Sequence, residues 1–248
     1  MTEATPEPAG PPPASPFDVP AYRVGVVDLL GVLAYGELSA FERLAADAAL
    51  APTLADKAAL ADMASAEYHH YERLAGRLVE MGADPYEAME PFVASIDGFH
   101  ESTRPADWLE GLIKAYVGDG IGADFYREVS THLDPDTRDL VLAVCGDTGH
   151  AEFAIDRVRA AIAEDPRVAG RLALWGRRLV GEMLSQAQRV AAERDNLANL
   201  LVGGITGSPA GEDGYAGLPG FDLAEVGRIF AQLTEAHTRR LQALGLAA

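Results

Sequence analysis

Two histidines offer the clearest chemistry in this chain, because each follows a carboxylate by three positions. Glu67 precedes His70, and Asp147 precedes His150. Residues three apart on a helix are neighbours one turn from each other, so each pair could bind one cation between its side chains. A single pair of this kind is weak evidence, since helical surfaces carry many acids.

The two pairs belong to a longer repeat. His70 and His150 are 80 residues apart, and so are the acids that precede them. An acid that follows a glycine also recurs upstream of each pair, as Glu37 and as Asp119, 82 residues apart. The repeat predicts two helical hairpins, each with a lone acid on its first helix and an acid-x-x-His pair on its second.

The distance of each acid from its turn decides which one belongs to the site. Facing residues of an antiparallel hairpin lie equally far from the turn, which is expected at a Pro-Thr pair in the first hairpin. Glu37 then lies at the same height along the hairpin axis as residues 67–70. Glu42 is displaced along that axis by roughly 7–12 Å, at 1.5 Å per residue. The same count favours Asp119 over Asp124 in the second hairpin.

Six side chains are therefore expected to converge as metal ligands: Glu37, Glu67, His70, Asp119, Asp147 and His150. Four buried carboxylates without a counter-charge would be strongly destabilising, and two divalent cations would neutralise them. Carboxylate oxygen with imidazole nitrogen suits iron or manganese. The single cysteine excludes a cysteine-cluster metal site and an internal disulfide. His69 points about 100° away from His70 around the helix, so we do not expect it to be a ligand.

The elements that must position these ligands read as helices. The chain has 248 residues, 48% of them apolar, which is enough for a substantial core, and no alternating strand pattern is evident. Periodicity and capping signals predict helices at about 21–50, 53–81, 105–132, 135–164 and 166–195. Residues 83–104 read as a long connection. The predicted organisation is a Pro-rich arm at 1–20, a helical bundle at 21–195, a Gly-rich linker at 196–220 and an amphipathic helix at 221–248.

Charge is spread unevenly along the chain. The net charge is −18, and residues 1–152 alone account for −18, whereas residues 153–195 carry +2. The arginines of that basic stretch either pair with the acidic remainder or contact an anionic partner such as tRNA. Those considered for tRNA are Arg157, Arg159, Arg167, Arg171, Arg177 and Arg178.

The ligand pattern resembles that of the ferritin-like di-iron carboxylate proteins, which use one Glu from each of two helices and Glu-x-x-His from each of two others. Within that superfamily, residues 22–195 look most similar to the tRNA 2-methylthio-isopentenyladenosine hydroxylase-like branch. The resemblance implies an all-α fold, a ferritin-like four-helix bundle with additional C-terminal helices. The long connection matches the single crossover of the class. Asp119 and Asp147 stand where the family usually has Glu, and the shorter side chain implies a more loosely held metal.

The resemblance implies two iron ions, or manganese, in an oxygen-activating oxidase or hydroxylase acting on a modified tRNA base or a small molecule. No catalytic residue beyond the metal ligands is expected. No rubredoxin-like cysteines or flavin motif are present, so a separate electron-donor protein is implied. Two alternatives stay open: a non-enzymatic ferritin-like metal-binding or interaction protein, and a ferroxidase that handles iron.

The location and assembly of the protein follow from weaker signals. No secretory signal or apolar run of about 18 residues is evident, so we expect a cytoplasmic protein without a membrane partner. The last helix has an apolar face that could dock on the bundle or on a second copy in a homodimer.

Overall fold

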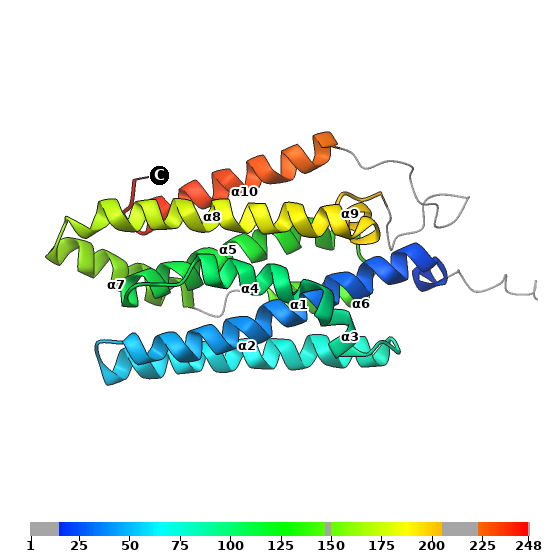
Figure 1. Cartoon of the computed structure of the whole chain (residues 1–248), viewed down its shortest axis with the longest axis horizontal. Helices are drawn as coiled ribbons and strands as arrows, with labels where there is room; N and C mark the ends of the chain where they lie inside the picture. Colours follow the sequence, from blue (N-terminus) through cyan, green and yellow to red (C-terminus); the bar gives the residue numbers. More distant parts are fainter. Residues whose placement is uncertain (1–14, 147–149, 205–222, 248) are drawn as a thin grey trace, which may run out of the picture.

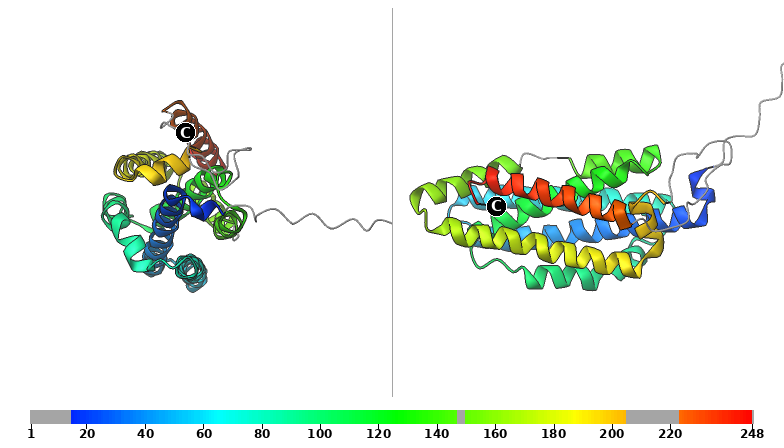
Figure 2. Two further views of the ribbon diagram at one scale, coloured as in Figure 1. Left: turned by 90° about the vertical axis from the view of Figure 1, so that its right-hand side faces the viewer. Right: turned by 90° about the horizontal axis from the view of Figure 1, so that it is seen from above.

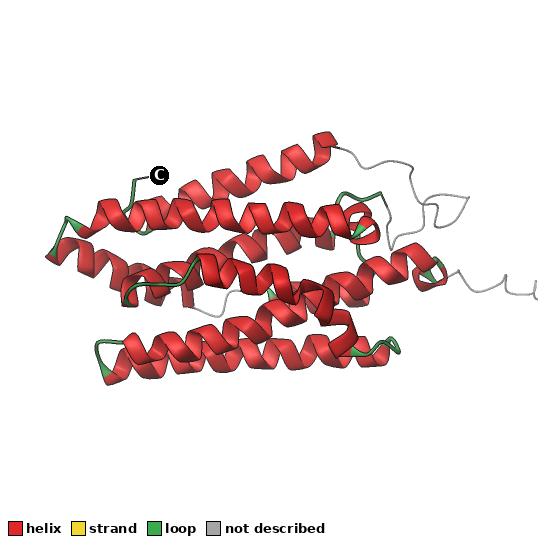
Figure 3. Ribbon diagram, viewed as in Figure 1, coloured by secondary structure: helices red, strands yellow, loops and turns green. Residues whose placement is uncertain are grey.

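The computed structural model describes residues 15–146, 150–204 and 223–247, with the backbone alone for residue 150 and residues 223–226. Every regular element in these ranges is a helix (Figure 3). The prediction of an all-α fold is therefore confirmed. The long helices run side by side along one common direction, as in a bundle (Figure 1).

The first hairpin consists of α1 (Pro20–Asp47) and α2 (Leu54–Glu80), which lie antiparallel along one edge of the bundle (Figure 1). A short 3-10 helix, η2 (Ala48–Leu50), continues α1 toward the turn. Thr53 caps α2, because its side chain accepts a hydrogen bond from the backbone N–H of Asp56. Both helices lie close to their predicted bounds.

The long connection expected at 83–104 does join the two hairpins, and it is largely helical. It contains α3 (Pro85–Met89), the 3-10 helix η3 (Glu90–Phe92) and α4 (Val93–Ser102). Prolines in this segment indicated a loop, yet proline stands in the first turn of both α3 and η3. A proline is tolerated there, because the N–H that it lacks would have no helical partner.

The crossing of α3 over α1 depends on Gly31. A Cβ atom on this residue would lie 2.2 Å from the carbonyl oxygen of Ala88. No side chain fits at that distance, so the glycine allows the backbones of the two helices to approach. The crossing in turn brings α4 over the middle of the bundle.

The second hairpin differs from the prediction in its second arm. α5 (Trp108–Ser130) agrees with the helix expected there. The single helix expected at 135–164 is instead two helices, α6 (Pro135–Val144) and α7 (His150–Glu164). Asp134 caps α6, because its side chain accepts a hydrogen bond from the backbone N–H of Thr137. A glycine two residues beyond the end of α6 disfavours continuation of that helix.

The C-terminal part contains α8 (Val168–Glu193), α9 (Asp195–Leu201) and α10 (Leu223–Ala243). A linker was expected at 196–220, but α9 occupies its first residues. Residues 205–220 of the expected linker lie outside the described part of the chain. α10 packs against α5 and α8 (Figure 2), so its apolar face is buried within the chain. Most of the expected N-terminal arm lies outside the described residues, and η1 (Pro16–Asp18) is a short 3-10 helix.

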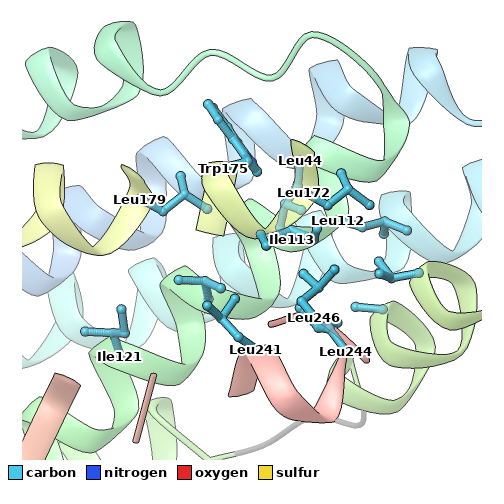
Figure 4. Close-up of a cluster of buried hydrophobic side chains, with 14 of the residues drawn as sticks. Leu44, Leu112, Ile113, Ile121, Leu172, Trp175, Leu179, Leu241, Leu244 and Leu246 are labelled. Carbon is cyan, nitrogen blue, oxygen red and sulfur yellow. The ribbon is translucent and has the colours of Figure 1, made fainter. Parts of the chain in front are cut away.

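Two apolar clusters hold the bundle together. One joins α5, α8 and α10 with the end of α1, and contains Trp175, whose indole N–H donates a hydrogen bond of 3.0 Å to the carbonyl oxygen of Glu110 (Figure 4). The other joins α1, α2, α3 and α9, and contains the fully buried Tyr22. Removing one large buried side chain from either cluster would cost about 2–5 kcal/mol of folding free energy.

One helical segment, Pro20–Leu50, is long and apolar enough to cross a membrane by length and composition, with a mean hydropathy of 1.6. Half of its most apolar window is buried inside the molecule. It packs against α2, α3 and α9, so it serves as the core helix of the bundle.

Candidate metal centre

Glu37, Glu67 and His70 form a compact cluster between α1 and α2. One candidate ligand atom from each of the three lies within 4.8 Å of the others. His70 Nδ1 is 3.4 Å from Glu37 Oε2 and 3.6 Å from Glu67 Oε2. Glu67 and His70 are one turn apart on α2, and Glu37 faces them from α1, whereas Glu42 is not part of the cluster. We call these three residues the triad.

The triad holds protons where a cation would be expected. Burial of Glu67, which is 6% exposed, together with the neighbouring Glu37 raises the pKa of its carboxyl to about 7. The neighbouring carboxyl groups of Glu37 and Glu67 raise the pKa of His70 to about 9. At neutral pH, a protonated imidazole therefore lies between two carboxyl groups. A metal ion that displaced its proton would find two oxygen donors and one nitrogen donor.

The triad opens into a cavity of about 660 Å³, and Asp119 of α5 lines the same cavity. Cys145 lies on this wall too. Burial and the negative charge of Glu37, with smaller effects of Glu67 and Asp119, raise the pKa of the Cys145 thiol to about 12. Asp119 thus shares the cavity wall with the triad, but it is exposed, whereas a buried carboxylate was expected there. The donor set of the triad itself is carboxylate and imidazole, which suits iron or manganese.

The remaining two predicted ligands cannot be placed. Asp147 lies outside the described residues, and so does the side chain of His150, whose backbone begins α7. The chain on both sides of this gap lines the cavity, at Gly146 and at Ala151. Asp124, the less favoured acid of α5, pairs with Arg127 at 2.9 Å and with an arginine of α10.

Comparisons with known proteins agree with this architecture. Residues 20–204 match the model of a family described as a ferritin-like domain of actinomycetes. The chain belongs to this family. A solved structure of an aldehyde deformylating oxidase from Synechococcus has a similar ferritin-like fold, with a TM-score of 0.67, 20% sequence identity and 94% of each chain covered. No curated protein matches the chain. The ferritin-like resemblance is thus confirmed, and the tRNA hydroxylase-like branch stays a prediction.

Two other histidines of this ferritin-like chain lie outside the triad. His69 is exposed, and its Nδ1 is 2.7 Å from the carbonyl oxygen of Ser65 in the preceding turn. His237 is buried on α10, and burial lowers its pKa. Neither belongs to the triad.

His100 is the residue that sequence reasoning missed. It lines the cavity of the triad, and its buried Nδ1 has no hydrogen-bond partner among the described residues. Burial and the nearby charges of Lys114 and Arg43 lower the pKa of His100 to about 3. No sequence spacing links these residues, because α4 and α5 meet only through the fold.

The arginines considered for tRNA binding all make contacts within the ferritin-like chain. Arg171 pairs with Asp107 at 2.6 Å and with the buried Glu110. Arg157 pairs with Asp56 at 2.7 Å. Among the others, an ion pair links Arg167 to Asp165, and hydrogen bonds link Arg159 to the carbonyl of Ala243, Arg177 to that of Ala247 and Arg178 to that of Ser102. These contacts favour the interpretation that the arginines balance the acidic part of the chain.

Proposed function

We propose that this protein is an iron-dependent oxidase, with manganese as the alternative metal, that acts on an apolar small molecule. The observation that carries the proposal is the triad, two carboxyl groups and an imidazole within 4.8 Å of one another on the wall of a large cavity. The donor types fit a divalent metal of this class.

The proposal assigns the first metal to Glu37, Glu67 and His70. It assigns a second metal to Asp119, Asp147 and His150. The place of Asp119 on the same cavity wall supports the second assignment, as do the cavity-lining residues on both sides of the gap at 147–149. Aspartate is one methylene shorter than glutamate, so we expect this second position to bind metal more weakly.

Bound iron would supply dioxygen activation, and the chain's own residues would supply binding and seclusion. The carboxylates set the charge of the site, and His70 must lose its proton before it can act as a nitrogen donor. Much of the cavity wall is apolar, with contributions from Met63, Phe125 and Phe230. Such a wall excludes water and accommodates an apolar substrate. Electrons would come from a separate donor protein.

The cavity also separates this proposal from its alternatives. A volume of about 660 Å³ is in the range of small-molecule sites, and neither an iron store nor a purely interacting module requires such a space beside its metal. The intrachain contacts of the arginines favour a small molecule over tRNA as the substrate.

Metal analysis combined with oxygen uptake tests the proposal. Full-length protein from iron-supplemented cells should contain between one and two irons per chain, and it should consume oxygen when a chemical reductant is supplied. Less than about half a metal per chain, or zinc alone, would overturn the assignment. Iron without oxygen uptake would indicate the non-enzymatic module, and iron in large excess over two per chain would indicate iron storage.

A further inference from the structure

We propose that the cavity has a second functional end, which binds the carboxylate of an apolar monocarboxylic acid while the body of that acid extends toward the triad. This inference rests on the proposed function for the role of the triad, and its own test measures binding. The residues that carry it are Arg43, Asp47, His100 and Lys114, all of which line the same cavity as the triad. We call them the polar end.

The polar end is separate from the metal centre. On α1, Arg43 and Asp47 follow Glu37 by six and ten residues, which corresponds to about 9 and 15 Å along the helix axis. On α5, Lys114 precedes Asp119 by five residues, or about 7.5 Å. A ligand that reaches from one end to the other must therefore be elongated.

Lys114 is the central residue of the polar end. It is 7% exposed, its ammonium group donates a hydrogen bond of 2.9 Å to the carbonyl of Thr103, and it lies 5.3 Å from the centre of the Phe99 ring. An ammonium group has three donors, so two remain for a ligand. Burial lowers the pKa of Lys114 to about 8, against the opposing effect of Asp47. The cation is thus held in the wall although its surroundings disfavour the charge.

The charges around Lys114 leave room for one anion. Arg43 and Lys114 are cations. Asp47 is the nearby carboxylate, and both cations favour its ionised form. Neither cation forms an ion pair with a carboxylate of the described residues. His100 stays neutral, and its buried Nδ1 has no partner there. The net charge of about +1 matches a carboxylate, whereas a phosphate dianion would leave an excess of negative charge.

The orientation of the ligand follows from charge. The polar end has two cations, the exposed Arg43 and the buried Lys114, whereas the triad has two carboxyl groups. The carboxylate of the ligand would therefore lie at the polar end, between the two cations. Apolar side chains such as Leu33, Leu44 and Met63 line the remaining cavity, so the hydrocarbon part would extend inward. The atoms that reach the triad would then belong to the apolar part of the molecule, away from the acid group.

Binding of dodecanoate and of the uncharged 1-dodecanol to the full-length protein as purified tests this inference. Calorimetry should show that dodecanoate binds at least about tenfold more tightly than 1-dodecanol. Lys114→Met should weaken dodecanoate binding by about tenfold to a hundredfold, the range for a charged hydrogen bond, and leave 1-dodecanol binding nearly unchanged. Arg43→Met should have a smaller effect in the same direction, because Arg43 is exposed.

The matched control is Arg189→Met, which removes an exposed arginine of α8 that does not line the cavity. It should bind dodecanoate like the wild type. Equal affinities of the wild type for acid and alcohol would overturn the inference without any variant. It would also be overturned if Lys114→Met bound dodecanoate normally while Glu37→Gln did not, since the acid would then bind at the metal centre. The metal content of the same samples separates failure of this inference from failure of the proposed function.

Discussion

Metal binding to the triad should depend steeply on pH, because the ion must displace protons that the triad holds. The pKa of His70 is raised to about 9 and that of Glu67 to about 7. Between about pH 7 and 9, binding releases about one proton, so affinity should rise about tenfold per pH unit. Below about pH 7 a second proton must leave, and the slope should approach a hundredfold per unit.

The sign follows from which state holds the proton. The metal-free triad is protonated below its raised pKa values and the metal-bound triad is not, so acid favours the free form. Above about pH 9 the affinity should level off, because no further proton is displaced. A competition titration of manganese(II) against a fluorescent chelator at several values between about pH 6 and 9 measures this dependence without iron oxidation.

Glu37→Gln tests the origin of the effect. Glu37 is the largest cause of the raised pKa of His70 and also raises the pKa of Glu67. The variant should bind manganese more weakly, and its steep range should move to lower pH. An affinity of the wild type that is constant from about pH 7 to 9 would refute the reasoning, since His70 would then not carry a proton that the metal displaces.

Three further results are expected. His70→Ala should lose metal, whereas His69→Ala should retain it; elemental analysis showing the reverse would place the wrong face of α2 at the site. Gly31→Ala should cost about 1–3 kcal/mol of unfolding free energy because its Cβ meets the backbone of α3, whereas Gly181→Ala, with open space around it, should be neutral or stabilising in the same denaturation experiment. Arg171→Glu should lower the melting temperature by about 2–4 °C, because it places a third negative charge beside Asp107 and Glu110. In a filter-binding assay at low salt, the wild-type protein should not bind tRNA. If the wild type bound tRNA and this variant did not, tRNA would be restored as a partner.

The first hairpin could be derived from the sequence because its geometry is local. Thr53 fixes the start of α2, and a short turn makes the residue count on each side a measure of height along the bundle. That count placed Glu37, and not Glu42, opposite His70, where the structure has it. The start of α6 is equally local, since it depends on the Asp134 cap and on Pro135 in the first turn.

The polar end could not be derived in this way because it depends on how distant helices cross. His100 comes from α4, and it shares a cavity with Lys114 of α5 only because α4 packs against α1 and α8. Several hydrogen bonds hold α4 there: the Tyr35 hydroxyl donates to Asp97 at 2.9 Å, Lys114 donates to the carbonyl of Thr103, and Arg178 donates to that of Ser102. No periodicity within residues 83–104 encodes these pairings. The prolines of that segment indicated a loop, whereas the structure has helices there.

The two halves of the repeat are unequal in a way that bears on metal occupancy. In the first half, the spacing that brings Glu67 and His70 onto one face lies within the unbroken helix α2. In the second half, α6 ends at Val144, and Asp147 and the side chain of His150 lie outside the described residues. The i, i+3 argument requires a continuous helix, and α2 provides one for Glu67 and His70. The ligands of the first half are therefore held by helical geometry. Aspartate is one methylene shorter than glutamate, so we expect the triad to be the position that a metal fills first.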